Sequence, residues 1–527
     1  MLPKRLQERP LPEEFARKLL VHSTNAKSGS LATGELHEVY SPYFSAPLGH
    51  VGVGSVADVE KAFELARHAQ KQWQERPIAA RARVIKRFHD LVKKHSDLLA
   101  DIVQLETGKD RTAAYDEVLD VMNNARYYAN NAEKFLSTSS KAGAFPVITS
   151  TTQQRVPKGI VGQISPWNYP LALGVSDAIA ALIAGNGIVA KPDWQTPFSN
   201  LIALHLLLNA GLPHNLFQIV TGSGTVVGQA IAQRCDYLMF TGSTATGKLL
   251  GKVVGERLVG YSAELGGKNP MIIAPDADVA KHADTIATAC FSNSGQLCVS
   301  IERIYAHTDI YDEFLRAFKA ATEKLTLGSG LNWNYSMGSL INQDQLDRVT
   351  AFVVDAVEKG ATVVTGGKAR PDVGPYHFEP TILTDLGPDT DLETEEVFGP
   401  VVYVQRVDSL EEAVELANDT NYGLNASVFG ATETAERLAW QIESGSVTIN
   451  DGYAATWASI STPLGGVKES GMARRHGPEG MTKYTEVKNI AQQRIMPMRG
   501  PKQLPRKYYG QLMTTALDLG KKLKFLP

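Results

Sequence analysis

The stretch YLMFTGSTATGK, Tyr237 to Lys248, is the part of the sequence that decides the fold. A short apolar run that suits a buried strand leads directly into a glycine-containing turn and the start of a helix. At such a junction glycine lets a phosphate approach backbone N–H groups at the positive end of the helix. The spacing departs from the dinucleotide fingerprint GxGxxG, because the only glycines are Gly242 and Gly247. On this stretch alone, a nucleotide site and a tight turn without a ligand both remain open.

Short apolar runs of the same kind recur along the chain, separated by segments with helical periodicity. From about Val56 to Ser137, apolar residues recur every three or four positions, which indicates helices. Strand-like runs then alternate with helical ones, and a second series of this kind begins near Asn269. The runs are GIVGQIS, GNGIVAKP, FQIVTG and NPMIIAP, followed by ATVVTGG, VVYVQRV and SGSVTIND. This alternation predicts an α/β protein with mostly parallel sheets flanked by helices.

Length, charge and cysteine content limit the class of protein. A chain of 527 residues suffices for two to four domains of roughly 100–200 residues each. The formal net charge of −3 argues against nucleic-acid binding through a basic surface. Three cysteines in so long a chain form no disulfide scaffold, which favours a reducing compartment. The basic N-terminus lacks the apolar stretch of an export signal. We therefore expect a cytoplasmic protein with no nucleic-acid partner.

The segment LALGVSDAIAALIAGNGIVA, Leu171 to Ala190, approaches the length and apolarity of a membrane-spanning helix. Asp177 lies within it, and the turn residues at 185–187 interrupt it. A buried helix, a turn and a short strand from Ile188 to Ala190 explain the pattern better. We therefore expect no membrane span.

One of the three cysteines lies in unusual surroundings. Cysteine is most often a small buried apolar residue, and the apolar contexts of Cys235 and Cys290 fit that role. Cys298 lies instead in the polar, glycine-containing stretch FSNSGQLCVS. A nucleophilic thiolate needs a polarising neighbourhood and a base that moves protons. Glu264, in the apolar and glycine-rich stretch AELGGKNP, is the candidate base, because an apolar environment raises the pKa of a carboxyl group toward neutrality.

These residues belong to a series of motifs that resembles the NAD(P)-dependent aldehyde dehydrogenase family over residues 40–495. The motifs, in chain order, are SPWNYP, KPDWQTP, FTGSTATG, ELGGKNP, FSNSGQLC, EEVFGP, NYGLNASVF and PLGGVKESG. So many motifs in this order do not arise by chance. Within the family, the strings CFSNSGQLCVSIER, RRHGPEG and YTEVK make the chain look most similar to succinate-semialdehyde dehydrogenases of actinobacteria.

The resemblance implies a covalent mechanism. Cys298 would attack the aldehyde carbon, and the side-chain amide of Asn168 and the backbone N–H of Cys298 would hold the oxyanion of the thiohemiacetal. Hydride would pass to the nicotinamide and leave a thioester, which water activated by Glu264 would hydrolyse. Glu396 is counted with these catalytic residues, because it would hold the nicotinamide ribose. The implied cofactor site comprises Trp167, Asn168, Lys191, Trp194, Gly242, Ser243, Leu265, Glu396 and Phe398. No metal is expected.

The resemblance also implies an aldehyde dehydrogenase-like α/β fold with two Rossmann-like domains and an arm. Residues 30–137 and 157–265 would form the cofactor-binding domain, and residues 266–465 the catalytic domain. Residues 138–156 and 478–497 would form a β-strand oligomerisation arm. Because such arms add strands to a neighbouring sheet, we expect a homodimer or homotetramer. Residues 1–29 would be an N-terminal extension and residues 499–527 a basic tail.

The sequence departs from the family pattern at Trp194. Relatives that prefer NAD usually carry a glutamate three residues after the equivalent of Lys191, and its carboxylate binds both ribose hydroxyls. Trp194 removes the charge that would repel a 2′-phosphate, so NADP becomes acceptable. We expect NADP as the preferred cofactor and NAD as a second one.

A second departure concerns the aldehyde substrate. Arginines in the tunnel of better-known succinate-semialdehyde dehydrogenases grip the distal carboxylate, whereas this chain has Ser176 and Ser292 at the matching positions. Serine forms no bidentate ion pair with a carboxylate. The other expected tunnel residues are apolar or aromatic: Tyr169, Leu173, Leu297 and Trp457. We expect oxidation of succinate semialdehyde to succinate, with a broad-specificity dehydrogenase of aliphatic or aromatic aldehydes as the alternative.

Two other classes of relative are disfavoured by residues that are present. A non-catalytic structural relative would lack Cys298 or Glu264, and relatives that acylate coenzyme A commonly lack the base at Glu264.

The tail has a composition of its own. It carries seven basic residues against Asp518 alone: Arg499, Lys502, Arg506, Lys507, Lys521, Lys522 and Lys524. Its helical part, expected over Leu512 to Leu523, is short and contains two threonines, which limits the apolar face. We therefore expect the tail to dock on the oligomer rather than on a membrane.

Overall fold

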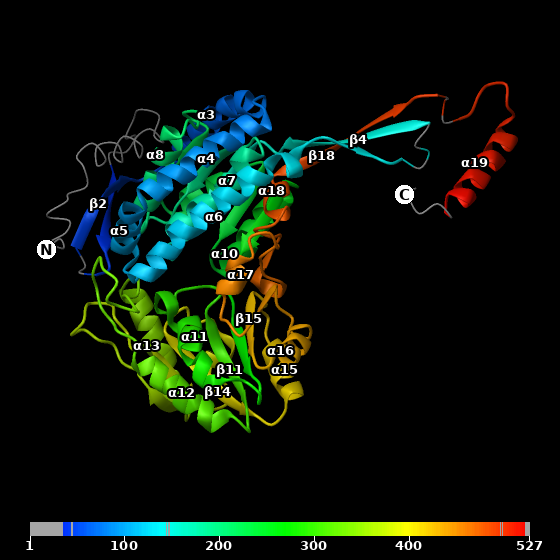
Figure 1. The fold of residues 1–527 in the computed structure, drawn as a ribbon. Coiled ribbons are helices and arrows are strands. Elements are labelled where there is room, and N and C mark those ends of the chain that lie inside the picture. The colour runs from blue at the N-terminus through cyan, green and yellow to red at the C-terminus, as the bar shows by residue number, and fades with distance from the viewer. Residues whose placement is uncertain are drawn as a thin grey trace.

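The computed structural model describes residues 35–521, except 44, 45, 144, 146, 147, 496 and 498. The predicted N-terminal extension lies outside the described residues. Two α/β units, each with its own sheet, stand one above the other, and a long β arm extends from the upper unit (Figure 1). A hairpin of β1 (Leu36–Ser41) and β2 (Ala46–Gly52) lies at the opposite side of the upper unit from the arm.

The first sheet has six strands in the order β17-β9-β8-β5-β6-β7, and all neighbours are parallel except the edge pair β17–β9. Short runs of buried β-branched and aromatic residues form its central strands, as expected for a sheet covered on both faces. The strands are β5 (Ile160–Ile164), β6 (Gly187–Lys191), β7 (Phe217–Ile219), β8 (Tyr237–Thr241), β9 (Gly260–Glu264) and β17 (Gly471–Met472). The chain order reverses between β5 and β8, and the carboxyl ends of strands at such a switch point form a crevice for ligands.

Helices pack against this sheet and against each other. The region from Val56 to Ser137 folds into helices, as its periodicity predicts, and α3 begins with a capping box between Ser55 and Asp58. The helices are α3 (Val56–Gln74), α4 (Ile78–Lys94), α5 (Ser96–Thr107), α6 (Arg111–Leu136), α7 (Pro170–Ile183), α8 (Phe198–Asn209), α9 (Gln229–Ala232) and α10 (Thr244–Glu256).

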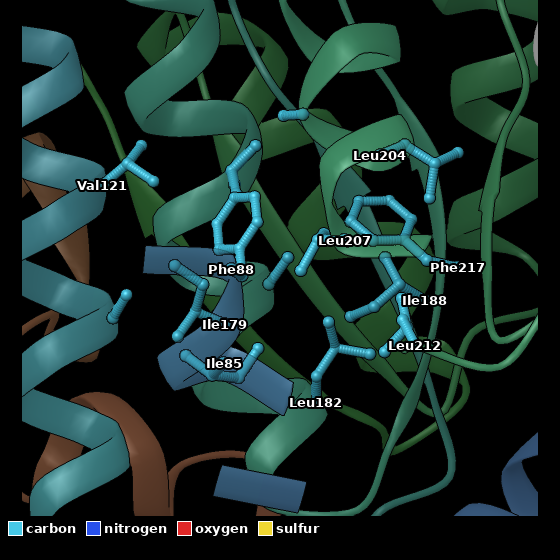
Figure 2. Packing of buried hydrophobic residues seen from close by; sticks show 14 of the residues in the cluster. Ile85, Phe88, Val121, Ile179, Leu182, Ile188, Leu204, Leu207, Leu212 and Phe217 are labelled. Atoms are coloured by element: carbon cyan, nitrogen blue, oxygen red, sulfur yellow. The ribbon is translucent and has the colours of Figure 1, made fainter. Parts of the chain in front are cut away.

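The core of this unit lies where α4, α6, α7 and α8 meet β6 and β7. Phe88, Val121 and Ile179, from three different helices, lie close together in it (Figure 2). Full burial of such side chains stabilises the fold by about 1.5–3 kcal/mol each. Leu171–Ala190 is the buried helix, turn and strand that its pattern predicts. Within the described part of the chain, no helix has the length and apolarity to cross a membrane.

The second sheet has seven strands in the order β12-β13-β14-β11-β10-β15-β16, of which only β12 runs antiparallel to its neighbour. The chain passes from the first sheet to the second between β9 and β10. The domain limits expected from the sequence remain predictions. Its strands are β10 (Asn269–Ile273), β11 (Ile301–His307), β12 (Thr362–Thr365), β13 (Thr381–Thr384), β14 (Val401–Val407), β15 (Asn425–Phe429) and β16 (Ser446–Ile449). The helices of this unit are α11 (Val279–Phe291), α12 (Tyr311–Glu323), α13 (Gln343–Glu358), α14 (Asp391–Thr394), α15 (Leu410–Asn418), α16 (Thr432–Ala439) and α17 (Ala454–Ala458).

The arm is a three-stranded antiparallel sheet in the order β18-β4-β3. Its strands are β3 (Ser139–Lys141), β4 (Thr149–Pro157) and β18 (Thr485–Gln493). The predicted arm segment that begins at 478 starts differently in the structure. Its first residues form α18 (Glu479–Thr482), which packs beside α6 and α7, because Met481 and Tyr484 are buried in the core of the upper unit.

The described part of the tail contains one helix, α19, which spans Arg506–Gly520. The sequence-based expectation of a helix over Leu512 to Leu523 was therefore wrong at the N-terminal side, where the helix begins directly after Pro505. Proline fixes φ near −65° and favours the start of a helix over its interior, which explains this boundary.

Candidate active site

Four strands of the first sheet end beside one another and carry residues of the predicted site. Asn168 follows β5, Lys191 ends β6, Gly242 and Ser243 follow β8, and Glu264 ends β9. Because these strands are parallel neighbours, the structure brings all five residues to one edge of the sheet.

Cys298 follows a loop with unusual backbone geometry at the end of α11. Asn293, Ser294 and Gly295 have φ values of 51°, 54° and 70°, in the left-handed region. Such a conformation is unfavourable for residues other than glycine and is typical of functional sites. A Cβ atom at Gly295 would lie 2.1 Å from the backbone oxygen of Gly399, so this position requires glycine.

Cys298 as a residue is partly exposed, whereas the other two cysteines are buried, as predicted. The side chain of Asn269 fixes the Cys298 backbone by donating a hydrogen bond of 2.8 Å to its carbonyl oxygen. Burial, together with the carboxyl groups of Glu396 and Glu264, raises the pKa of Cys298 to about 12. The thiol therefore stays protonated at neutral pH until a base takes its proton.

Glu264 is 6% exposed, and burial raises the pKa of its carboxyl group to about 7. The positive charge of Arg475 acts in the opposite direction on this pKa. The Oε1 atom of Glu264 has no hydrogen-bond partner among the described residues. A buried carboxyl group that titrates near neutrality and has a free oxygen is suited to general-base catalysis.

Asn168 is held from two sides, by Gln296 of the FSNSGQLC motif and by Lys109, which no motif had indicated. Its Nδ2 donates to the carbonyl oxygen of Gln296 at 3.1 Å, which leaves the second amide hydrogen available. Lys109 donates to the backbone oxygen of Asn168 at 2.7 Å and lies 3.6 Å from the centre of the Tyr169 ring. Lys109 also forms a fully buried ion pair of 2.6 Å with Glu117. Lys109, just before α6, and Glu117 on α6 thus fix the turn that carries the predicted oxyanion-binding amide.

The turn after β8 is built for close approach of a ligand. Ser243 caps α10 by accepting a hydrogen bond from the backbone N–H of Thr246 at 3.4 Å. A Cβ atom at Gly247 would lie 2.5 Å from the side chain of Leu265, so glycine lets α10 pack directly on the start of the ELGGKNP stretch. The first N–H groups of α10 face the edge of the sheet, which fits a phosphate group.

Lys191 and Trp194 lie at the neighbouring strand end. Lys191 is buried, which lowers the pKa of its ammonium group, while Asp193 acts to raise it. The indole of Trp194 is 39% exposed and stacks on the ring of His37, with ring centres 4.4 Å apart and planes 5° apart. The contribution of His37, from the β1–β2 hairpin, was not predicted, because stacking across so long a sequence separation leaves no local pattern.

The predicted nicotinamide residues approach the same edge from the second unit. The rings of Trp167 and Phe398 meet edge to face, with centres 5.5 Å apart. Glu396 accepts a hydrogen bond of 3.0 Å from the backbone of the ELGGKNP stretch, and burial raises the pKa of its carboxyl group to about 7. Glu302, in a buried ion pair of 2.6 Å with Lys268, accepts a hydrogen bond from the Phe398 N–H and so fixes this loop.

A cavity of about 360 Å³ lies between the two units and reaches these groups. Eight predicted residues lie on its wall: Asn168, Tyr169, Leu173, Glu264, Ser292, Leu297, Cys298 and Trp457. Ser176, also predicted as a tunnel residue, is not part of the wall. Its hydroxyl donates to Asp120, whose side chain reaches the cavity in its place.

The wall also carries charged residues that were not predicted as tunnel residues: Asp116, Glu117, Asp120, Asp451 and Arg475. Asp120 accepts a hydrogen bond of 2.9 Å from the indole N–H of Trp457. Arg475 forms an ion pair of 3.1 Å with Asp177 through Nε. Arg475 belongs to the RRHGPEG string, but the sequence had linked that string only to a group of relatives and not to the tunnel. The aspartates lie outside every motif.

This arrangement defines a class of protein. A parallel sheet with a ligand crevice at its switch point, facing a second α/β unit that supplies a cysteine, is the architecture of dinucleotide-dependent α/β dehydrogenases.

The chain belongs to the aldehyde dehydrogenase family, whose family model matches residues 30–490. A protein of Mycobacterium tuberculosis (strain ATCC 25618 / H37Rv), named as a candidate NADP(+) succinate-semialdehyde dehydrogenase, is 50% identical over 474 residues, which are 90% of this chain and 91% of that protein. The solved structure of an Escherichia coli NADP-dependent enzyme is 32% identical with a TM-score of 0.84, covering 87% of this chain and 95% of that one. An NAD+ complex of aldehyde dehydrogenase from Bacillus cereus is 34% identical with a TM-score of 0.83, covering 88% and 94%. The protein is therefore an NAD(P)-dependent aldehyde dehydrogenase.

Proposed function

We propose that Cys298 is the nucleophile, Glu264 the general base and Asn168 the oxyanion-binding amide in the oxidation of an aldehyde to a carboxylic acid. One observation carries this proposal: the three side chains line a single cavity, and Glu264 presents a buried oxygen without a hydrogen-bond partner among the described residues. A polar atom left unpaired in this way is costly unless a ligand or water pairs with it during function.

The chemistry then follows from these groups. Glu264 takes the thiol proton of Cys298 and releases it to solvent, while the thiolate adds to the aldehyde carbon to form a thiohemiacetal. The free N–H of the Asn168 amide and the backbone N–H of Cys298 stabilise its oxyanion. When bound, the nicotinamide cofactor supplies the hydride acceptor that the oxidation to a thioester requires. Glu264 next takes a proton from water, the hydroxide adds to the thioester carbonyl, and Cys298 leaves as the carboxylic acid is released.

NADP is the cofactor that we propose, with NAD as a second one. The Mycobacterium tuberculosis relative is named for NADP(+), and position 194 carries no acid that would repel a 2′-phosphate. The donor set fits a dinucleotide, because a capped helix N-terminus, a buried lysine and a pair of aromatic rings meet at one sheet edge. The residues that would hold it are Trp167, Asn168, Lys191, Trp194, Gly242, Ser243, Leu265, Glu396 and Phe398.

Succinate semialdehyde is the substrate that we propose. The relatives at about half identity are named for it. Among the described residues of the cavity wall, Arg475 is the only arginine or lysine. Its Nε is paired with Asp177, and its terminal nitrogens have no hydrogen-bond partner in the described part of the chain, so they remain available for a carboxylate.

The alternative, an aldehyde without a carboxylate, is favoured by a different observation. Asp116, Asp120 and Asp451 lie on the same wall as Arg475. Like charges about 4 Å apart oppose each other by about 1–4 kcal/mol in surroundings between bulk water and a protein surface. These aspartates would therefore weaken binding of an anionic substrate, while the apolar and aromatic wall would accept an aliphatic or aromatic aldehyde.

A substrate survey separates these possibilities. We expect kcat/KM with NADP to be at least about tenfold higher for succinate semialdehyde than for pentanal, which has a similar length and no carboxylate; tenfold corresponds to about 1.4 kcal/mol. Benzaldehyde tests the aromatic part of the alternative. Equal or higher values for pentanal or benzaldehyde would reject succinate semialdehyde and support the alternative.

The roles of the two reactive residues need a separate experiment. Cys298→Ala should abolish aldehyde oxidation, whereas Cys290→Ala, at a buried cysteine away from the cavity wall, should retain it. Glu264→Gln should keep a rapid first turnover of NADPH formation at alkaline pH, followed by slow thioester hydrolysis. Turnover by the Cys298 variant would contradict the assignment of the nucleophile.

We also propose that the protein is a cytoplasmic homodimer or homotetramer, assembled through the arm. The proposed domain limits are those predicted from the sequence. All three cysteines are free, as a reducing compartment allows. Strand β18 is an exposed outer strand of the arm sheet, and such edges pair readily with another chain. Light scattering should give two or four times the mass of one chain, and the mass of a single chain would reject this proposal.

A further inference from the structure

Helix α19 stands apart from the rest of the molecule. It lies at the far end of the arm, away from both sheets (Figure 1). No other described helix or strand packs closely along it. Tyr509 is its one buried residue, and the ring lies against Gly500 in the tail itself. A helix of this length is marginal in water without a covering partner, so its packing partner lies outside this chain's own fold.

One side of α19 is a continuous apolar face. Tyr508, Leu512 and Leu519 recur at helical spacing and are 60%, 59% and 55% exposed, whereas Leu517, which is 52% exposed, lies on another side of the helix. Of the two threonines that were expected to limit this face, Thr514 lies on the polar side, whereas Thr515, three residues after Leu512 and four before Leu519, lies at the border of the face. Their hydroxyl groups donate to backbone oxygens one turn earlier, so neither needs a partner outside the helix.

The tail that carries this face is strongly basic. Residues 499–527 carry seven basic residues and one acidic residue, a net charge of +6 in a chain whose net charge is −3. Arg506 and Lys507 occupy the first turn of α19, where the helix dipole disfavours cations and no acidic residue offsets them. Asp518 is itself paired with Lys521 at 2.9 Å. Arg506 and Lys507 therefore do not serve the stability of the helix, which points to an anionic partner.

We propose that α19 binds the surface of a membrane that contains anionic lipids, with its apolar face in the interface and its basic residues on the headgroups. Such a surface offers an apolar layer and negative charge together, the two features that α19 matches. The helix has 15 residues, too few to span the bilayer, so it lies in the plane of the surface. The proposal departs from the expectation that the tail docks on the oligomer, because the described helix begins six residues earlier than expected and pairs both threonine hydroxyls internally.

The test uses the full chain and vesicles of phosphatidylcholine with or without phosphatidylserine, measured by co-sedimentation. The protein should bind vesicles with phosphatidylserine, bind those without it much less, and detach as salt is raised. Leu512→Glu should weaken binding by about tenfold or more, because it places a charge in the apolar face. Gln511→Glu adds the same charge one residue away on the polar side and should weaken binding much less.

All variants should oxidise aldehyde in solution at the rate of the unaltered protein, since α19 lies far from the cavity (Figure 1). The proposal is overturned if the unaltered protein does not bind phosphatidylserine vesicles. It is equally overturned if Leu512→Glu and Gln511→Glu weaken binding alike, because the apolar face would then have no part in it. Absence of vesicle binding together with a lower oligomer mass for Leu512→Glu would show that α19 docks on a second copy of the chain instead.

Discussion

At Glu264, burial and a neighbouring cation shift the same carboxyl group in opposite directions. Burial raises the pKa of Glu264, and Arg475 makes the largest contribution that lowers it. The base acts only when deprotonated, so kcat/KM should rise with pH through the pKa of about 7. In Arg475→Met the lowering charge is lost, and the acid limb of the pH–rate profile should move to higher pH.

The neighbouring arginine provides the matched control. Arg474 donates to backbone oxygens of Gly466 and Ala473 and has a smaller effect on Glu264. Arg474→Met should therefore move the acid limb less than Arg475→Met. Loss of the ion pair with Asp177 will also lower the melting temperature of Arg475→Met, but the position of the limb does not depend on the amount of folded enzyme. If the acid limb lies at the same pH in the unaltered protein, Arg475→Met and Arg474→Met, Arg475 does not influence the pKa of Glu264.

Cofactor choice is decided, in our proposal, by the residue at position 194. Trp194→Glu would place a carboxylate beside a 2′-phosphate at a partly exposed site, at a cost of about 1–4 kcal/mol. The ratio of kcat/KM for NADP to that for NAD should fall by about tenfold or more. Trp194→Gln loses the same stacking on His37 without adding a charge, so its ratio should change little. Equal ratios for the Glu and Gln variants would mean that charge at this position does not select the cofactor.

At the scale of elements, the loop before Cys298 depends on one glycine. Gly295→Ala would strain a residue at φ +70° and press its Cβ atom against a backbone oxygen, which together cost about 3 kcal/mol or more. Because small displacements of a nucleophile are costly, kcat/KM should fall by about a hundredfold. Gly360→Ala, at φ +105° with nothing within 4 Å, isolates the backbone strain. It should cost about 1–2 kcal/mol of stability and leave kcat/KM unchanged. Similar kcat/KM values for both variants would contradict the role of this loop.

The elements that the sequence predicts well are those with a local pattern. Apolar runs place the buried strands, and motifs place Cys298, Glu264 and Asn168 at the edge where the chain segments meet. The supporting residues have no such signal. Lys109 holds Asn168 from 59 positions away, and Glu302 holds Phe398 from 96 positions away. Such contacts depend on tertiary packing, which also explains why the aspartates of the cavity wall were not predicted.

At the scale of the whole molecule, the free energy of unfolding should depend on the protonation of Glu106, which is far in sequence from Glu264 and Cys298. This residue is 1% exposed and accepts hydrogen bonds from the Ser199 and Phe198 N–H groups at the start of α8. Burial outweighs these hydrogen bonds and raises the pKa of Glu106 from 4.5 to about 8. A group whose pKa is raised on folding stabilises the fold below its unfolded value, and that stabilisation is lost as pH rises through the folded value.

The free energy of unfolding should therefore contain a contribution from Glu106 of a few kcal/mol that disappears between about pH 4.5 and pH 8. Glu106→Gln has no proton to lose, so its stability, although lower at acid pH, should fall less steeply over this range. The measurement is urea unfolding of the cofactor-free protein at several pH values, with the difference between the two proteins isolating this one group. Glu75→Gln, at an exposed glutamate, should follow the unaltered protein throughout. If Glu106→Gln and the unaltered protein lose stability in parallel, Glu106 does not hold a proton in the folded state near neutral pH.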